Sequence, residues 1–333
     1  MTDSSATIII PNYNGRRYLP RLMETVTGQS RPPDEIIVVD DGSTDDGVPY
    51  LREHWPRVRL IENPRNRGFA ASCNVGIRAA ATPIVVLLNN DTHVDGQWLA
   101  EGLKPFENDA VAAVASLVLL ADVPHLIDTA GDVYSVAGGA VKRAHLERRE
   151  IGEGLPTICL SPSGVSAFYR RKEVMTVGLL DERFESYYED VDLGLRLARL
   201  GQRCVFAPRS ICYHHLSSSY DPGGWRYHYH SARNAEIVWW ANMPIRLLVK
   251  YLPAHLIFLG LQVAHKLAQG HGRAYAAGKL AALGHVKHVG AKRRLIGATA
   301  RTTSRQFEFM LDRRWWHLHV GSRRRRPAPG DRA

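Results

Sequence analysis

Residues 34–45 read Asp-Glu-Ile-Ile-Val-Val-Asp-Asp-Gly-Ser-Thr-Asp, an apolar run that leads into a polar loop. A short apolar run bounded by turn residues predicts a buried strand, which we place over residues 34–40. Runs of the same kind predict strands over residues 7–11, 58–62 and 84–88, with helical segments ending near residue 27 and spanning about residues 68–80. This alternation predicts an α/β protein with a doubly wound, mostly parallel sheet flanked by helices.

Polar residues follow these strands, and sheets of this kind bind ligands at the carboxyl ends of their strands. Tyr13, after the first strand, could stack on a nucleotide base or simply cover the sheet edge. Asp40 and Asp41 could accept a hydrogen bond from a pyrimidine N3–H or a ribose hydroxyl, although Asp-Gly turns are common in any case. Asn89-Asn90-Asp91 resembles a degenerate Asp-x-Asp motif, in which Asp91 would hold Mg²⁺ or Mn²⁺.

None of the predicted strands is followed by a Gly-x-Gly-x-x-Gly fingerprint or by a phosphate-binding P-loop. This argues against a dehydrogenase or an ordinary nucleoside triphosphatase. The four cysteines show no Cys-x-x-Cys spacing, which predicts free thiols, and the N-terminus lacks the basic region of a secretion signal. We therefore expect a cytosolic protein.

Residues 184–196 contain three acids, Glu189, Asp190 and Asp192, at the start of a predicted helix and directly after two tyrosines. Acids in a first helical turn gain from the unpaired N–H groups and from the helix dipole. Three acids this close also repel one another, which makes sense if one acts as a base or faces a cation. The alternative is an acidic cap on a surface helix.

The chain of 333 residues has a net charge of +10, which is distributed unevenly. Residues 1–224 hold 23 Lys and Arg against 29 Asp and Glu, whereas residues 225–333 hold 20 against 4. The basic C-terminal block predicts a polyanionic surface as partner. Because no nucleic-acid recognition motif accompanies the charge, an anionic membrane is favoured over nucleic acid.

Residues 245–267 are rich in apolar side chains, but Lys250, Pro253, His255 and His265 interrupt them. Their longest uninterrupted stretch, residues 256–264, is far shorter than the roughly 20 residues that span a bilayer. We predict amphipathic helices that lie in the membrane interface, with helices that pack on the catalytic domain or form a homodimer as the alternative. Trp239, Trp240, Trp315 and Trp316 are candidate interfacial anchors, and Arg323 to Arg326 begin a basic, disordered tail.

The order and spacing of these motifs resemble the family 2 glycosyltransferases, in particular their rhamnosyltransferase-like branch. The resemblance covers about residues 7–240 and implies the glycosyltransferase-A fold. One departure is Asn89, where the family often has Asp. The matching motifs are residues 7–15, 38–45, 63–70 with Asn74, 87–91, 164–171, 177–184, the acidic helix and residues 213–219.

The resemblance implies inverting, metal-dependent transfer of a sugar, rhamnose or another hexose, from a UDP- or dTDP-sugar. The acceptor would be a polyprenyl diphosphate-linked saccharide or another cell-envelope glycan. Asp190 matches the family's general base, and Glu189 would orient or tune it. Asp91 and His214, 24 residues after Asp190, would hold Mg²⁺ or Mn²⁺, with the adjacent His215 as the alternative. The remaining candidates are Pro11, Tyr13, Asp40, Asp41, Asn66, Gly68, Asn89 and Asn90 for the nucleotide-sugar, and Arg170, Tyr188 and Asp192 on the acceptor side.

These expectations define a domain plan. Residues 1–235 would form the catalytic domain, with a nucleotide-sugar-binding half over residues 1–115 and an acceptor-binding half over residues 116–235. Residues 236–320 would form the helical region and residues 321–333 the basic tail. The enzyme would be cytoplasmic and peripheral on the inner face of the cell membrane. A catalytically silent membrane-bound scaffold and a sugar nucleotidyltransferase are the alternative functions.

Overall fold

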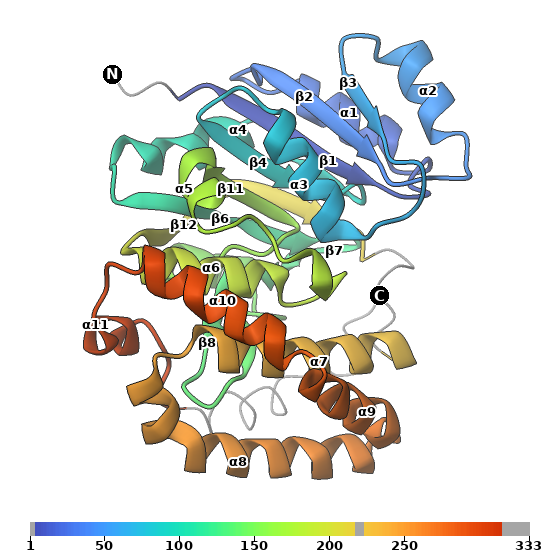
Figure 1. Ribbon diagram of the computed structural model, residues 1–333. Helices are drawn as coiled ribbons and strands as arrows, with labels where there is room; N and C mark the ends of the chain where they lie inside the picture. Colours follow the sequence, from blue (N-terminus) through green and yellow to red (C-terminus); the bar gives the residue numbers. More distant parts are fainter. Residues whose placement is uncertain (1–3, 217–222, 315–333) are drawn as a thin grey trace.

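A computed structural model describes residues 4–216 and 223–314. Its centre is a mixed sheet whose main path runs β10-β12-β6-β11-β4-β1-β2-β3 (Figure 1). The four predicted strands are confirmed and form the parallel part of this sheet. They are β1 (Ala6–Asn12), β2 (Glu35–Asp40), β3 (Arg59–Glu62) and β4 (Ile84–Leu88).

Helices cover both faces of the parallel strands, as a doubly wound sheet requires. Ile8 and Ile10 of β1 pack in one buried cluster with residues of α1 (Leu19–Thr27). Ile9, whose side chain points to the other face, packs in a second cluster with residues of α3 (Phe69–Ala79). With both faces buried, the strands read as continuous apolar runs, which explains why the sequence predicts them well.

The second half of the sheet is mixed rather than parallel. β11 (Ser166–Arg170) runs antiparallel to β4 and to β6 (Val111–Leu120), and β12 (Arg203–His214) runs parallel to β6. The last residue of β12, His214, pairs with Thr92 of β5 (Thr92–Val94) and so reaches the loop after β4. The smaller strands are β7 (Val123–Thr129), β10 (Ile158–Cys159) and the hairpin of β8 (Asp132–Tyr134) with β9 (Ala140–Lys142).

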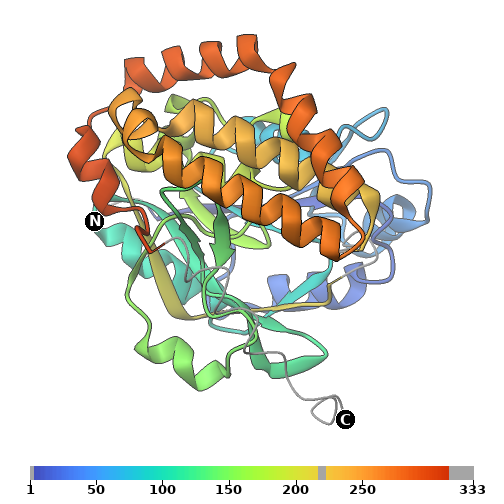
Figure 2. The same ribbon diagram turned by 90° about the horizontal axis from the view of Figure 1, so that it is seen from below.

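The C-terminal helices pack beneath the sheet (Figures 1 and 2). α7 (Trp225–Asn242) packs on α9 (Gly272–Leu283), and α10 (Val286–Thr299) packs on α7 and on α6 (Glu189–Leu200). The expected domain boundary after residue 235 falls inside α7, so one continuous helix runs through it. The remaining helices are α2 (Gly47–His54), α4 (Trp98–Leu103), α5 (Arg171–Thr176), α8 (Ile245–Ala268), α11 (Ser304–Phe309) and the short η1 (Lys104–Glu107), η2 (Arg149–Gly154) and η3 (Glu182–Phe184).

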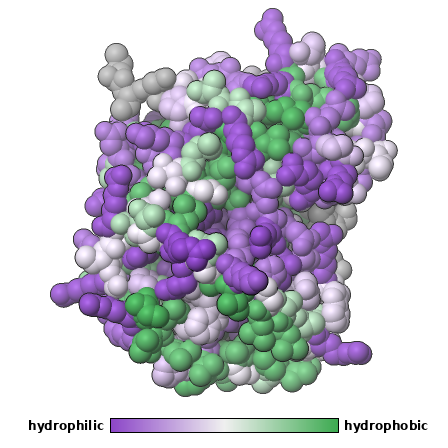
Figure 3. All heavy atoms as spheres, in the orientation of Figure 1, coloured by the Kyte–Doolittle hydropathy of each residue, from purple (hydrophilic) through white to green (hydrophobic). Residues whose placement is uncertain are grey.

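α8 differs from its neighbours because much of its apolar surface is exposed. Leu256 and Ile257 are each 56% exposed, and Leu261 is 60% exposed. Apolar residues gather over α8 on the molecular surface (Figure 3). By length and composition alone, α8 is the one helix in the described part of the chain that could cross a bilayer. The sequence prediction differs because it counted only the uninterrupted apolar stretch, residues 256–264. Trp315, Trp316 and the tail from Arg323 lie outside the described residues.

Candidate active site

A cavity of about 1240 Å³ opens between the carboxyl ends of the parallel strands and the helices α6 to α9. The loops after β1, β2 and β4 line one side of it through Tyr13, Asp41 and Asp91. The first turn of α6, which carries Asp190, lines it as well, together with the β8–β9 hairpin and parts of α7, α8 and α9. Asp91 and Asp190 are far apart in the chain and line the same cavity.

The carboxylate of Asp41 holds the loop that follows β3. It accepts hydrogen bonds from the backbone N–H of Arg67 at 3.0 Å and of Gly68 at 2.8 Å. Gly68 has a φ of +89°, and a Cβ at this position would lie 3.2 Å from the backbone oxygen of Glu185. A glycine is needed here for its conformation and for this close approach. Asp41 thereby fixes the loop that brings Asn66 to the cavity wall.

Amide side chains connect the ends of β1 and β4. Asn90 donates a hydrogen bond from Nδ2 to Oδ1 of Asn12 at 2.9 Å, and Asn12 donates from Nδ2 to Oδ1 of Asp40 at 3.0 Å. Asp40 also accepts from the backbone N–H of Ser43 at 2.9 Å, and it does not line the cavity. Asp40 therefore orders the loops, whereas Asn89 and Asn90 line the cavity.

His214 lies between two carboxylates. Its Nε2 is 3.4 Å from Oδ2 of Asp91, and its Nδ1 is 3.0 Å from Oδ2 of Asp128. Lys142, which also lines the cavity, places its Nζ 2.6 Å from the second oxygen of Asp128. Asp128 itself is fully buried at the end of β7. When the His214 ring is neutral, a hydrogen bond donated from Nδ1 to Asp128 leaves the Nε2 lone pair directed to the side of Asp91.

The charges of this group depend on one another. Burial opposes a charge on His214, but the hydrogen bonds and charges of Asp128 and Asp91 outweigh burial and raise its pKa to about 9. Burial also disfavours the Asp128 carboxylate, yet Lys142 and His214 hold its pKa well below the usual range. The site thus concentrates negative charge around one imidazole ring, and it presents carboxylate and imidazole ligands side by side.

A second acidic group consists of Glu189 and Asp190 at the start of α6 and Asp132 at the start of β8. Burial raises the pKa of all three carboxyl groups, and the charge of Asp190 adds to the rise at Glu189 and Asp132. Asp190 keeps some exposure to the cavity, and its Oδ2 accepts a hydrogen bond from the backbone N–H of Gly164 at 2.9 Å. Oε2 of Glu189 has no hydrogen-bond partner within the described residues. A carboxylate with a raised pKa is the better proton acceptor near neutral pH.

The loop before these acids has a strained backbone. Glu185, Tyr187 and Tyr188 have φ values of 63°, 72° and 72°, which cost roughly 1–3 kcal/mol for each residue. Asn234 of α7 is fully buried and holds this loop, because its Nδ2 donates to the backbone oxygens of Ser186 at 3.0 Å and of Tyr187 at 2.8 Å. α7 thereby stabilises the conformation in which Tyr188 lines the cavity.

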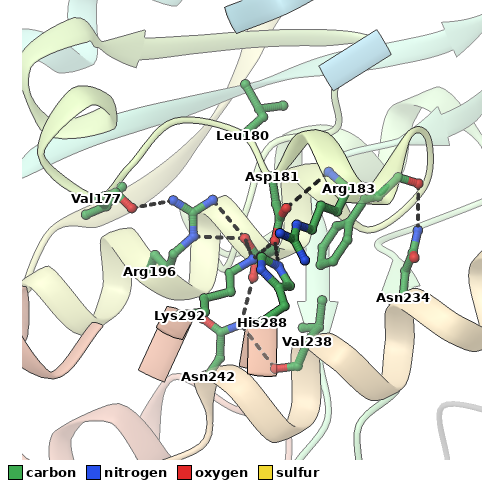
Figure 4. A network of polar contacts seen from close by, with 12 residues as sticks. Val177, Leu180, Asp181, Arg183, Arg196, Asn234, Val238, Asn242, His288 and Lys292 are labelled. Atoms are coloured by element: carbon green, nitrogen blue, oxygen red, sulfur yellow. Dashed lines mark hydrogen bonds and ion pairs between the residues drawn. The ribbon is translucent and has the colours of Figure 1, made fainter. Parts of the chain in front are cut away.

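Asp192 is fully buried and does not line the cavity. Its carboxylate lies 2.7 Å from Nη2 of Arg196 and 2.8 Å from Nζ of Lys292 on α10. Lys292 also contacts Asp181 at 2.6 Å, and Asn242 of α7 donates to Asp192 at 2.8 Å (Figure 4). Burial alone would raise the pKa of Asp192, but Arg196 and Lys292 lower it. The network ties α6 to α7 and α10, which does not fit the acceptor-side role expected for Asp192.

Arg170 also lies away from the cavity, so the structure does not fit its expected acceptor-side role. It pairs with Ile84 at the beginning of β4, whereas the site follows the other end of that strand. Its guanidinium donates to the backbone oxygens of Val111 at 2.8 Å and Phe106 at 2.5 Å. The side chain therefore closes the far end of the sheet.

The structure brings most of the predicted site residues to one cavity and adds residues that the sequence reading missed. Asp128 and Asp132 belong to the missed set, as does Asn234. They stand outside any motif, so only their contacts with His214, Asp190 and the strained loop reveal them. The predicted residues that line the cavity are Pro11, Tyr13, Asp41, Asn66, Gly68, Asn89, Asn90, Asp91, Tyr188, Glu189, Asp190 and His214, whereas Asp40, Arg170 and Asp192 do not.

Comparison with known proteins shows which family this chain resembles. The family described as "Glycosyl transferase family 2" matches residues 7–174. The O-antigen biosynthesis protein RfbC of Myxococcus xanthus is 29% identical over 229 residues, which are 64% of this chain and 17% of that protein. The N-acetylglucosaminyl-diphospho-decaprenol L-rhamnosyltransferase of Mycobacterium tuberculosis is 28% identical over 249 residues, 66% of this chain and 78% of the relative.

Among solved structures, GalNAc-T7 with UDP, GalNAc and Mn²⁺ superposes with a TM-score of 0.58 at 16% identity, over 71% of this chain and 48% of that one. Identity this low establishes a shared fold only. The fold likeness confirms the glycosyltransferase-A architecture that the motifs implied.

Proposed function

Because the chain belongs to glycosyl transferase family 2, we propose that it transfers a sugar from a nucleoside diphosphate donor to a glycan acceptor with inversion. The observation that carries this proposal is the shared cavity of Asp91 and Asp190. The first residue lies where a leaving diphosphate would sit, beside the loops after the parallel strands. The second lines the same cavity from the start of α6, where an acceptor hydroxyl could reach it.

Asp190 is the proposed general base. As the acceptor oxygen forms its bond to the anomeric carbon, the bond from that carbon to the diphosphate oxygen breaks, and the hydroxyl proton passes to the Asp190 carboxylate. The attack comes from the face opposite the leaving group, so the configuration inverts. The raised pKa of Asp190 suits this step, and the backbone N–H of Gly164 keeps Oδ2 in place.

Asp91 and His214 are the proposed protein ligands for Mg²⁺ or Mn²⁺. Their facing atoms are 3.4 Å apart, and residues 4–216 and 223–314 contain no larger cluster of metal-binding side chains. Such a donor set fits a cation that takes its other ligands from substrate phosphates and water. When bound, the cation would neutralise the charge that develops on the leaving diphosphate. Asp128 would keep the His214 ring in the orientation that ligation needs.

Residues of the parallel half would bind the nucleotide of a UDP- or dTDP-sugar. Tyr13 is 45% exposed and lines the cavity, which suits stacking on a base. Asp41 and Asn66 line the same side. The Asp41 carboxylate, already held by backbone N–H groups, presents a fixed acceptor. The sugar, rhamnose or another hexose, would lie between this side and Asp190.

A lipid-linked saccharide is the proposed acceptor, and the inner face of the cell membrane is the proposed location. The name of the mycobacterial relative describes transfer to a diphospho-decaprenol acceptor. In this chain, α8 exposes Leu256, Ile257 and Leu261 within a C-terminal region rich in Lys and Arg. Exposed apolar side chains together with basic residues favour binding to the interface of an anionic membrane.

Two measurements test these proposals. Incubation with a panel of nucleotide-sugars and Mn²⁺ should release the nucleoside diphosphate from one donor class, and EDTA should suppress the release. Absence of turnover with every donor would contradict the enzymatic proposal. For the membrane, the double variant Leu256→Ser/Ile257→Ser should lose most sedimentation with phosphatidylglycerol vesicles, whereas Ile151→Ser, an exposed apolar residue of η2, should not.

A further inference from the structure

A second, smaller recess adjoins the active-site cavity beneath the start of α7. It has a volume of about 430 Å³ and is lined by Tyr227, His228, Lys266, Gln269 and His271. Tyr227, His228 and Lys266 also line the main cavity, so the two spaces are continuous. Among the residues that the structure describes, no carboxylate lines the recess, whereas Asp91, Asp132, Glu189 and Asp190 line the main cavity.

Lys266 differs from three other lysines of the C-terminal helices, each of which is paired with a carboxylate. Lys250 pairs with Glu308 at 2.7 Å, Lys279 with Glu236 at 2.5 Å, and Lys292 with Asp181 at 2.6 Å. Lys266 is half-buried, and no described carboxylate lies within ion-pair distance of it. Its Nζ donates to Oε1 of Gln269 at 3.4 Å, a long contact with a neutral group. Burial lowers the pKa of Lys266, which an anion at this place would reverse.

Two histidines stand beside Lys266. The ring of His228, which is buried, stacks on the ring of His271 with centroids 4.0 Å apart. Together with the ammonium group and the Tyr227 side chain, they make the recess rich in groups that can donate hydrogen bonds. Such a set suits a phosphate, whose oxygens accept several charge-assisted hydrogen bonds.

The recess also borders the apolar surface of α8. Leu267, next to Lys266, is 62% exposed, and Leu261, one of the main-cavity residues, is 60% exposed. An occupant would therefore find cationic groups on one side and an exposed apolar helix face on the other. This combination fits an amphiphile with an anionic head better than it fits a soluble phosphate compound.

We propose that the recess around Lys266 binds the diphosphate of a prenyl diphosphate-linked acceptor, with the prenyl chain lying along the exposed face of α8. The inference rests on the proposed function, because it supplies the acceptor that Asp190 would deprotonate. The continuity of the two spaces lets the sugar carried by this diphosphate extend toward Asp190. The donor diphosphate would remain at the other end, beside Asp91.

Binding of farnesyl diphosphate tests the proposal without requiring turnover. Isothermal titration is performed on the full chain with saturating UDP and Mn²⁺, which occupy the donor site. We expect Lys266→Gln to weaken binding about tenfold or more, since hydrogen bonds to charged groups contribute roughly 1.5–3 kcal/mol. Lys266→Arg should retain most of the affinity. Lys287→Gln, which removes an exposed lysine of α10 outside both cavities, should leave it unchanged.

Several results would overturn the proposal. One is equal affinity of the wild type and Lys266→Gln for farnesyl diphosphate while UDP binding and the melting temperature are intact. Another is farnesol binding as tightly as farnesyl diphosphate, which would leave no role for the phosphates. If inorganic diphosphate bound as tightly as farnesyl diphosphate, the prenyl chain would contribute nothing to binding, which contradicts its proposed place along α8. Donor turnover, measured separately, reports on the proposed enzymatic activity and is independent of these outcomes.

Discussion

Two acids on the first turn of α6, Asp190 and Asp192, have opposite surroundings. Residues i and i+2 of an α-helix are about 200° apart around its axis, so the side chains of Asp190 and Asp192 leave the helix on opposite sides. Asp190 lines the cavity with no described cationic group in ion-pair contact, and burial raises its pKa. Asp192 contacts Arg196 and Lys292, which lower its pKa against the effect of burial.

This difference separates a reactive carboxylate from a structural one within a single turn. The Asp192 network connects α6 to α7 and α10 and so fixes the position of the helix. That rigidity holds Asp190 and Glu189 in an environment that disfavours their ionisation. The comparison implies that substitutions on the two sides should affect different measurable properties, transfer on one side and stability on the other.

The largest expected effect follows from Asp190→Asn. Transfer should fall by about 10²–10⁴-fold, because positioned general bases contribute factors of this size. The variant should bind UDP with Mn²⁺ as the wild type does, since the donor side is untouched. Initial rates at saturating donor, together with UDP titrations, measure both. Transfer at the wild-type rate would remove Asp190 as the base.

Asp192→Asn should instead reduce stability. The change leaves Arg196 and Lys292 buried with less negative charge around them, which typically costs about 3–5 kcal/mol. Urea unfolding at neutral pH measures the loss, and transfer per folded molecule should change little. Because the folded pKa of Asp192 is lowered, its contribution is present above the ordinary carboxyl pKa and disappears as pH falls through the lowered value. The two proteins should therefore converge in stability toward acid pH.

The sequence predicts one of these two sides much better than the other. Buried parallel strands such as β1 and β4 read as continuous apolar runs, and the loops after them carry recognisable motifs. Asp190 belongs to another recognisable motif, the acidic start of α6. The partners of Asp192 are Arg196, within reach on the same helix, and Lys292, which is 100 residues away and whose position depends on how α10 packs. No local pattern reveals a contact of that kind.

The same reasoning explains the residues that were missed or misplaced at the site. Asp128 comes from β7, outside any motif, and reaches His214 only through the folding of the strands around β12. Arg170 lies within a motif, residues 164–171, but its strand runs antiparallel to β4, which places it at the far end of the sheet. Whether a strand pairs parallel or antiparallel depends on tertiary contacts, and the apolar pattern of a short strand does not predict it.

Asp128→Asn tests whether Asp128 positions His214 for metal binding. The substitution weakens the orientation of His214 without removing a proposed ligand, so Mn²⁺ affinity should fall about 10–100-fold. Titration of Mn²⁺ in the presence of UDP, followed by electron paramagnetic resonance, measures this directly. Asp122→Asn, a loop acid just before β7 that does not line the cavity, is the matched control. Unchanged Mn²⁺ affinity in the Asp128 variant would contradict a role of Asp128 in orienting His214 for metal binding.

Glu189→Gln gives the smallest expected effect and the sharpest contrast with Asp192→Asn, because it should stabilise the protein. Burial and the charge of Asp190 raise the folded pKa of Glu189, so the folded state holds a proton that the unfolded chain releases. The wild type therefore loses stability as pH rises from the ordinary carboxyl pKa through the raised one, and glutamine does not. Urea unfolding at a series of pH values should show equal stability in acid and an advantage for the variant that grows with pH, on the order of 1 kcal/mol. A variant less stable than the wild type near neutral pH would mean that Glu189 supports the fold as Asp192 does, and the division of this helical turn into a reactive and a structural side would fail.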